Sequence, residues 1–208
     1  MSIRDDKISE MLEHRLASVV LVAEATHLRH NLSAMIRSAE AFGVHNVHLI
    51  SSGMHTPKGA ARGAECWVKL HHHLDTRGCI ETLKSSGFKV YAADFQHDSY
   101  TPETLPIDQP VAIVMGTELR GVSSQAKAMV DGTICIPMAG QTQSLNVSVA
   151  TACILFRLTE RRREIIGTGD LSDEEKMGFI KDRDEKKLEH KRVLERRYQA
   201  GTKSGNEA

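Results

Sequence analysis

Small and polar residues follow two short apolar runs in the C-terminal half of the chain. The tripeptide Gly116–Glu118 comes directly after the first run, Val111–Met115. A loop that begins at Pro137 follows the second run, Thr133–Ile136. Such runs are typical of buried strands in a parallel sheet, and open α/β sheets bind ligands at the carboxyl ends of their strands. The two loops therefore predict a small-molecule site, although an ordinary turn also explains the glycine-rich tripeptide.

The second loop suits a flat, uncharged ring such as adenine. Pro137 cannot extend a central strand, so the chain must turn away from the sheet there. Backbone groups exposed by such a turn can bind a heterocycle between apolar side chains without any charged residue. The loop then leads into Leu145–Arg163, which reads as one long helix, apolar first and then basic. Ser144 or Asn146 would serve as its N-cap, and both residues could also orient a substrate.

A single arginine stands out in an apolar helix near the N-terminus. Leu32–Phe42 has apolar residues at helical spacing, and Arg37 is its only basic residue. Asn31 lies six positions earlier, about 9 Å away along a helix axis. On spacing alone, an ordinary surface arginine is the more common explanation. An arginine is a poor general base because its pKa lies above about 12, but it can stabilise a developing negative charge.

The elements expected around these residues alternate between strands and helices. Further strands are predicted at Val19–Ala23, Val47–Ile50, Trp67–Leu70 and Phe88–Ala93. Asp75 is placed to cap a helix that runs through Ser85, and Ile3–Arg15 predicts a short amphipathic helix on the domain. A strand–helix–strand beginning argues for right-handed parallel crossovers. We therefore expect an α/β fold, a parallel sheet with helices on both faces.

The composition changes near Gly167. Residues 1–166 are expected to form one domain with an N-terminal helix, and residues 167–208 a charged helical tail that is partly disordered. No apolar run approaches the roughly 18–20 residues of a membrane span, and the charged N-terminus does not resemble a signal peptide. The four cysteines form no CxxC pair, which favours reduced thiols in a cytoplasmic protein.

The charge balance and the histidine spacing argue against two further functions, coating of nucleic acid and metal binding. The chain has 27 basic and 27 acidic side chains, which disfavours a protein that coats nucleic acid by bulk charge but permits a local basic patch. Three adjacent histidines, His71–His73, suggest a metal site at first sight. Neighbouring residues on a strand point to opposite faces, so these three cannot converge on one ion, and no metal is expected.

Three motifs occur in order along the chain: HNLSAMIRSAEAFGV from His30, MGTELRG from Met115 and IPMAGQTQSLNVSVA from Ile136. Together they resemble the motifs of the TrmH (SpoU) family of SPOUT RNA 2′-O-ribose methyltransferases, and the resemblance extends from about Ile8 to Leu158. It implies S-adenosylmethionine as the cofactor, a C-terminal trefoil knot and a homodimer with the cofactor site at its interface. The substrate it implies is tRNA, at the D-loop guanosine of position 18.

The resemblance also implies roles for individual residues. Those of the catalytic site would be Arg37, Asn31, Glu118, Ser144 and Asn146. Those that contact the cofactor would be Ala93, Gly116, Ile136, Met138 and Leu145. Family proposals make Arg37 the general base, whereas the chemistry of arginine leaves a role in charge stabilisation equally open.

RNA contacts need basic side chains, and the candidates are Arg29, Lys58, Arg62 and Arg161. A solvated helix surface is the alternative for the arginines that follow Phe156. Two other functions are alternatives: methylation of ribosomal RNA, and a non-catalytic RNA-binding module. Met1–Ala17 is too short for an additional RNA-binding domain, which favours tRNA. The joint presence of the five catalytic candidates argues against the module. Neither a membrane nor DNA is expected as a partner.

Overall fold

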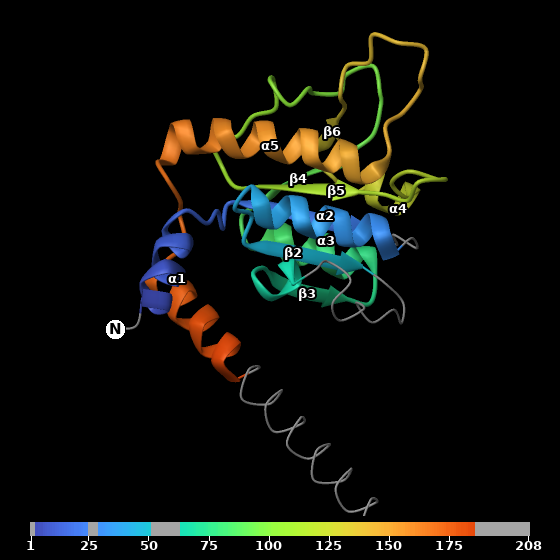
Figure 1. The fold of residues 1–208 in the computed structure, drawn as a ribbon. Coiled ribbons are helices and arrows are strands. Elements are labelled where there is room, and N and C mark those ends of the chain that lie inside the picture. The colour runs from blue at the N-terminus through green and yellow to red at the C-terminus, as the bar shows by residue number, and fades with distance from the viewer. Residues whose placement is uncertain (1–2, 25–28, 51–62, 186–208) are drawn as a thin grey trace, which may run out of the picture. The chain divides into compact units, whose positions relative to one another are not determined.

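The structure is a computed structural model that describes residues 3–24, 29–50 and 63–185 (Figure 1). It has two compact units, Met1–Leu171 and Ser172–Ala208, and each is considered by itself. None of the helices within the described ranges is long and apolar enough to cross a membrane.

The first unit is built on one six-stranded sheet of order β3-β2-β1-β5-β4-β6, in which every pairing is parallel. The strands are β1 (Val19–Glu24), β2 (Asn46–Ile50), β3 (Lys69–His73), β4 (Lys89–Ala93), β5 (Val111–Met115) and β6 (Gly132–Ile134). Every residue of β1 and β5 is buried, because these central strands are covered on both faces. This explains why both read in the sequence as unbroken apolar runs.

Helices cover both faces of the sheet, as predicted (Figure 1). On one face, α2 (Arg29–Ala41) and α5 (Val147–Ile166) share a core with Leu21 and Ile113. On the other face, α3 (Thr76–Ser85) and α4 (Ser124–Lys127) share a core with Val22. The N-terminal helix α1 (Ile3–Glu13) buries Leu12 almost completely. The α/β fold class is therefore confirmed.

Local signals placed several element boundaries correctly. Asp75 caps α3, because its carboxylate accepts the N–H of Gly78 at 2.8 Å. The predicted strand Val111–Met115 has the bounds of β5.

Two predicted strands were displaced. Trp67 belongs to a 3-10 turn instead of β3, since its N–H donates to Ala64. β6 ends at Ile134, and the N–H of Cys135 donates to Tyr100 in a neighbouring loop. Both differences arise from hydrogen bonds with residues outside the predicted strands.

The first unit extends past the boundary predicted at residue 166. Asp170 accepts the N–H of Ala17 at 2.5 Å, and its own N–H donates to Arg15 at 3.0 Å. A Cβ at Gly169 would lie 2.4 Å from the carbonyl oxygen of Glu13, so the chain passes this point only with glycine. Residues up to Leu171 thus complete the first unit.

In the second unit, residues 173–185 are helical. Ser172 and Glu175 cap this helix reciprocally. The N–H of Glu175 donates to the Ser172 hydroxyl at 3.2 Å, and the N–H of Ser172 donates to the Glu175 carboxylate at 2.8 Å.

Candidate functional site

Three of the predicted cofactor residues lie at the carboxyl ends of adjacent strands. Ala93 ends β4, Gly116 follows β5 directly, and Ile136 comes shortly after β6. Because β4 lies between β5 and β6 in the sheet, the three positions are neighbours. Ala93 and Ile136 are half-buried against the main core. Backbone groups from three chain segments therefore meet at one edge of the sheet, which is where an α/β fold places its ligand.

The backbone of the protein itself excludes any side chain at Gly116. A Cβ at this position would lie 2.0 Å from the carbonyl carbon of Gly121 and 2.2 Å from the nitrogen of Val122. The loop is tight because Thr117 and Gly121 exchange two hydrogen bonds of 3.0 and 2.9 Å. Gly121 adopts a φ of 64°, in the left-handed region that favours glycine. The turn that the sequence allowed is therefore real, and it follows directly from the carboxyl end of β5.

A chain of amide and carboxylate groups joins three distant segments. The Asn31 side-chain amide donates to the Glu118 carboxylate at 2.5 Å. The Asn146 amide in turn donates to the Asn31 side-chain oxygen at 3.3 Å. Asn31 comes from the first turn of α2 and is only 3% exposed, whereas Glu118 and Asn146 are exposed. In this Asn31–Glu118–Asn146 chain, Asn31 is the central residue and bonds to the other two. The chain therefore fixes α2 against both ligand-facing loops and presents two polar side chains at the surface.

Asn146 also caps α5. Its side-chain oxygen accepts the N–H of Ser148 at 2.9 Å and the Ser148 hydroxyl at 2.6 Å. The cap and the contact with Asn31 use opposite ends of one amide, so the predicted N-cap is confirmed for Asn146, and the orientation of a substrate stays a prediction. Ser144 precedes this cap and is exposed.

Two predicted cofactor residues present apolar surface to solvent. Met138 is 40% exposed and Leu145 is 36% exposed. Both belong to the segment between β6 and α5, which carries no charged side chain from Cys135 to Asn146. Exposed apolar side chains in an uncharged loop suit an adenosyl ring system, so this edge fits the cofactor that the resemblance implied.

Arg37 lies apart from the Asn31–Glu118–Asn146 chain, two helical turns further along α2. Its side chain is exposed, and it makes no hydrogen bond or ion pair with any residue in the ranges described above. The Arg37 guanidinium thus forms no bond that stabilises those parts of its own chain.

Two of the RNA-binding candidates, Lys58 and Arg62, lie outside the described residues. Arg29 is the first residue of α2, and its side chain is likewise outside what the structure describes.

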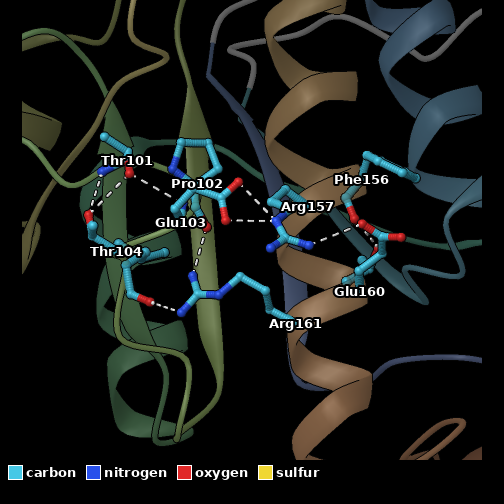
Figure 2. A network of polar contacts seen from close by, with 10 residues as sticks. Thr101, Pro102, Glu103, Thr104, Phe156, Arg157, Glu160 and Arg161 are labelled. Carbon is cyan, nitrogen blue, oxygen red and sulfur yellow. Dashed lines mark hydrogen bonds and ion pairs between the residues drawn. The ribbon is translucent and has the colours of Figure 1, made fainter.

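The fourth candidate, Arg161, uses its guanidinium inside the protein. It donates to the carbonyl oxygens of Pro102 at 2.7 Å and Leu105 at 3.1 Å, as Figure 2 shows for Pro102. These bonds account for the position of its guanidinium.

The other arginines of this part of α5 are engaged in the same way. Arg157 donates to both carboxylate oxygens of Glu103, at 2.8 and 2.9 Å (Figure 2). Arg162 is 7% exposed and donates to Ser18 and to the carbonyl of Ile107. Arg163 donates to the carbonyls of Thr168, His14 and Phe42. These arginines fasten α5 to the loop before β5 and to the N-terminal segment, although Arg157 and its partner Glu103 also lie at the surface.

Sequence analysis missed a buried carboxylate close to the site. Glu24 ends β1 and is 4% exposed. It accepts the Thr76 hydroxyl at 2.5 Å, the Ser123 hydroxyl at 2.6 Å and the Ser123 N–H at 2.8 Å. Glu24 thereby holds the end of the Gly116–Gly121 loop and the start of α3 against the central strand. Its only signal in the sequence is an acidic residue that ends an apolar run.

Replacing Glu24 with alanine should lower the free energy of unfolding by about 3 kcal/mol, because it leaves three donors without their acceptor in a buried pocket. Urea denaturation would measure this. Glu24→Gln keeps one acceptor oxygen and the side-chain volume, so its loss should be less than half as large. A loss below about 0.5 kcal/mol for Glu24→Ala would show that Thr76 and Ser123 find other partners.

Comparison with known proteins gives a consistent result. The model of the SpoU rRNA Methylase family matches residues 18–156. A tRNA (guanosine(18)-2′-O)-methyltransferase of Thermus thermophilus is 38% identical over 161 residues, which cover 76% of this chain and 83% of that one. The TrmH/SpoU tRNA modifying enzyme of A. aeolicus has a TM-score of 0.80 at 30% identity, over 89% of this chain and 96% of the other.

A more distant structure shares the fold. The SpoU methyltransferase AviRb of Streptomyces viridochromogenes, solved in complex with AdoMet, gives a TM-score of 0.63 at 22% identity. The alignment covers 73% of this chain and 62% of that one.

Proposed function

Because this chain belongs to the SpoU rRNA Methylase family, we propose that it transfers a methyl group from S-adenosylmethionine to the ribose 2′-hydroxyl of guanosine 18 in tRNA. The observation that carries the proposal is the Asn31–Glu118–Asn146 chain, which lies beside the Gly116 loop. Similarity to a relative of that activity over three quarters of this chain supports the choice of tRNA. The four cysteines are all free, which agrees with a cytoplasmic location.

The cofactor would be held mainly by backbone groups. The residues that would hold it are Ala93, Gly116, Ile136, Met138 and Leu145. Gly116 can carry no Cβ because the backbone of Gly121 and Val122 fills that space, so its part in the site is to let the Thr117–Gly121 loop close tightly. S-adenosylmethionine supplies an electrophilic methyl group on a sulfonium. This chain must align the ribose oxygen and stabilise it as its proton passes to solvent, while the methyl–sulfur bond breaks and S-adenosylhomocysteine leaves.

Several polar residues share the alignment and stabilisation of the ribose oxygen. Asn31 is locked by Glu118 and Asn146, so its position is set before substrate binds. Asn146 and Ser144 flank the start of α5, where they would orient the ribose. Arg37 stabilises the charge that develops on the 2′-oxygen, a role that suits a planar cation with several N–H donors. Since Arg37 bonds to none of the described residues of its own chain, we infer that it serves the cofactor site of the partner in a homodimer.

We also infer that the C-terminal half forms a trefoil knot. The loop of residues 94–110, which precedes β5, is bonded to β6 and to α5. Tyr100 exchanges hydrogen bonds with Thr133 and Cys135 at β6, and Arg161 of α5 binds the Pro102 carbonyl. Both β6 and α5 thus contact this loop, which supports the proposed knot. A crystal structure with residues 135–146 wholly outside the loop of residues 94–110 would contradict the knot.

The proposed reaction can be tested with purified protein, S-adenosylmethionine and a tRNA transcript, followed by mass-spectrometric mapping of the methylated nucleotide. We expect one 2′-O-methyl group, at guanosine 18. The matched control is the same tRNA with 2′-deoxyguanosine at that position, which should accept no methyl group. Methylation of ribosomal RNA but not of tRNA would favour the ribosomal alternative. An absence of cofactor binding in calorimetric titration would favour the non-catalytic module.

The second unit should contribute to tRNA affinity. Its residues carry many of the basic side chains of the chain, and phosphate contacts depend on such groups. A chain that ends at Leu171 should bind tRNA severalfold more weakly, with a shallower dependence on salt, while its affinity for S-adenosylmethionine stays the same. Filter binding at several salt concentrations would measure this. Truncation at Gly167 is a poorer test, because it also removes Asp170 and its bonds to the N-terminal segment. Unchanged tRNA affinity would refute the role of the second unit.

A further inference from the structure

Three metal-ligating side chains meet at a place that methyl transfer does not use. They are His48 of β2, His73 at the end of β3 and Cys79 of α3. His48 Nδ1 and His73 Nε2 are 2.9 Å apart, and the Cys79 sulfur is 4.0 Å from His48 Nδ1. All three candidate ligand atoms lie within 4.8 Å of one another. The cluster lies between α3 and the β2–β3 side of the sheet.

The three adjacent histidines His71–His73 do not converge on one point. His72 is exposed, while His71 and His73 share the other face with His48. Ligands from other elements make a site possible here. Parallel pairing brings β2 beside β3, with Ile50 in register with His73, and α3 adds a thiol above them. The expectation that no metal binds rested only on residues adjacent in sequence.

The distances are close to those that a tetrahedral ion needs. Bonds of about 2.0–2.1 Å from zinc to nitrogen and about 2.3 Å to sulfur imply separations of about 3.3 Å between nitrogens and about 3.6 Å between nitrogen and sulfur. The two imidazoles must therefore separate slightly, and the thiol must move slightly closer. His73 is only half-buried, so its ring can make most of this adjustment. Three protein ligands leave a fourth position for water.

The surroundings of His48 restrict the orientation of its ring. His71 stacks on His48 with ring centroids 4.4 Å apart and is itself oriented by Asn46 at 2.9 Å. This holds the His48 ring in place, as outer residues do in known metal sites.

Metal binding by Cys79 requires the loss of its thiol proton. Burial raises the pKa of Cys79 to about 12, and the charges of Glu24 and Asp75 add to this effect. An ion must therefore displace the thiol proton when it binds, as divalent metals do when they coordinate cysteine.

We propose that His48, His73 and Cys79 form a binding site for a thiophilic divalent cation of the zinc type, one that joins β2, β3 and α3. Two imidazoles and a thiolate select such ions over magnesium or calcium, which prefer oxygen ligands. The bound ion adds a link between three elements and stabilises this side of the folded domain. The site is separate from the Asn31–Glu118–Asn146 chain, so it does not depend on the proposed methyl transfer.

Cobalt(II) is the probe, because a thiolate ligand gives it a near-ultraviolet charge-transfer band and four-coordination gives it strong visible bands. The protein is the full chain without an affinity tag, treated first with a chelator. We expect about one Co²⁺ per chain with both sets of bands. Cys79→Ser should abolish the charge-transfer band, and His73→Gln should weaken Co²⁺ affinity at least about tenfold. Zn²⁺ should displace Co²⁺ and raise the melting temperature of the wild-type protein but not of His73→Gln.

His72→Gln is the matched control, since it changes the neighbouring histidine on the opposite face of the same strand. It should bind Co²⁺ as the wild type does. Circular dichroism would check that each variant is folded. If Cys79→Ser does not fold, the half-buried His73 still carries the test. Failure of the wild-type protein to bind Co²⁺, or an unchanged spectrum and affinity in His73→Gln, would overturn the proposal.

Discussion

Arg37→Ala is expected to reduce methyl transfer to tRNA by about a thousandfold or more, which is the usual effect of removing an arginine that stabilises transition-state charge. The variant should fold as the wild type does, because the Arg37 side chain is exposed and contributes no bond to the described residues of its chain. Its affinity for S-adenosylmethionine should also be unchanged. A single-turnover methylation assay, with circular dichroism and calorimetric titration alongside, would measure all three quantities.

Arg37→Lys separates charge from geometry. Lysine keeps the positive charge but lacks the planar, forked donor, so activity should fall between those of the wild type and Arg37→Ala. Full activity in Arg37→Ala would remove Arg37 from the reaction. The Asn31–Glu118–Asn146 chain would then have to act without a cationic partner.

Mixed dimers would show which subunit Arg37 serves. Arg37→Ala and Asn146→Ala chains should each be inactive alone. Asn146 contacts Asn31 within its own chain, so we assign it to the site of its own subunit. If Arg37 acts on the cofactor site of the partner, a mixed dimer has one site with every group intact, and activity returns when the two variants are combined. If Arg37 acts in its own subunit, both sites stay defective and the mixture remains inactive. The second result would refute the shared site.

Gly116→Ala is expected to lower the affinity for S-adenosylmethionine at least about tenfold and the free energy of unfolding by about 2 kcal/mol. The added methyl group would lie 2.0 Å from the carbonyl carbon of Gly121, and it meets backbone atoms that cannot rotate away. The Gly116–Gly121 loop must shift as a whole, and Glu118 then moves away from Asn31. Calorimetric titration and urea denaturation would measure the two effects.

Gly140→Ala is the matched control for this experiment. Gly140 lies in the other ligand-facing loop, where a Cβ would meet no atom within 4 Å, so its substitution should leave the stability close to that of the wild type. If Gly116→Ala and Gly140→Ala have equal stability and cofactor affinity, the Thr117–Gly121 hydrogen bonds do not hold the loop tightly around Gly116.

Elements that depend on nearby residues could be predicted well. β5 has the predicted bounds because five consecutive apolar residues suit only a doubly covered strand. Asp75 begins α3 as predicted because an N-cap is a contact over three residues. Boundaries set by distant residues were displaced. β6 ends early because Cys135 pairs with Tyr100, and the first unit continues to Leu171 because Asp170 binds Ala17.

The sequence by itself determined the fold class, the family and the residue types of the candidate site, because apolar periodicity, caps and motifs are written in neighbouring residues. Only the tertiary structure decided which of those residues touch. It joined Asn31 to Glu118 and Asn146, turned the arginines of α5 towards backbone carbonyls, and brought Cys79 to His48 and His73. The physical reason is that hydrogen bonds and ligand clusters depend on distances of a few ångströms between segments far apart in the chain. Those distances are set by the order in which the strands pair, which no local pattern records.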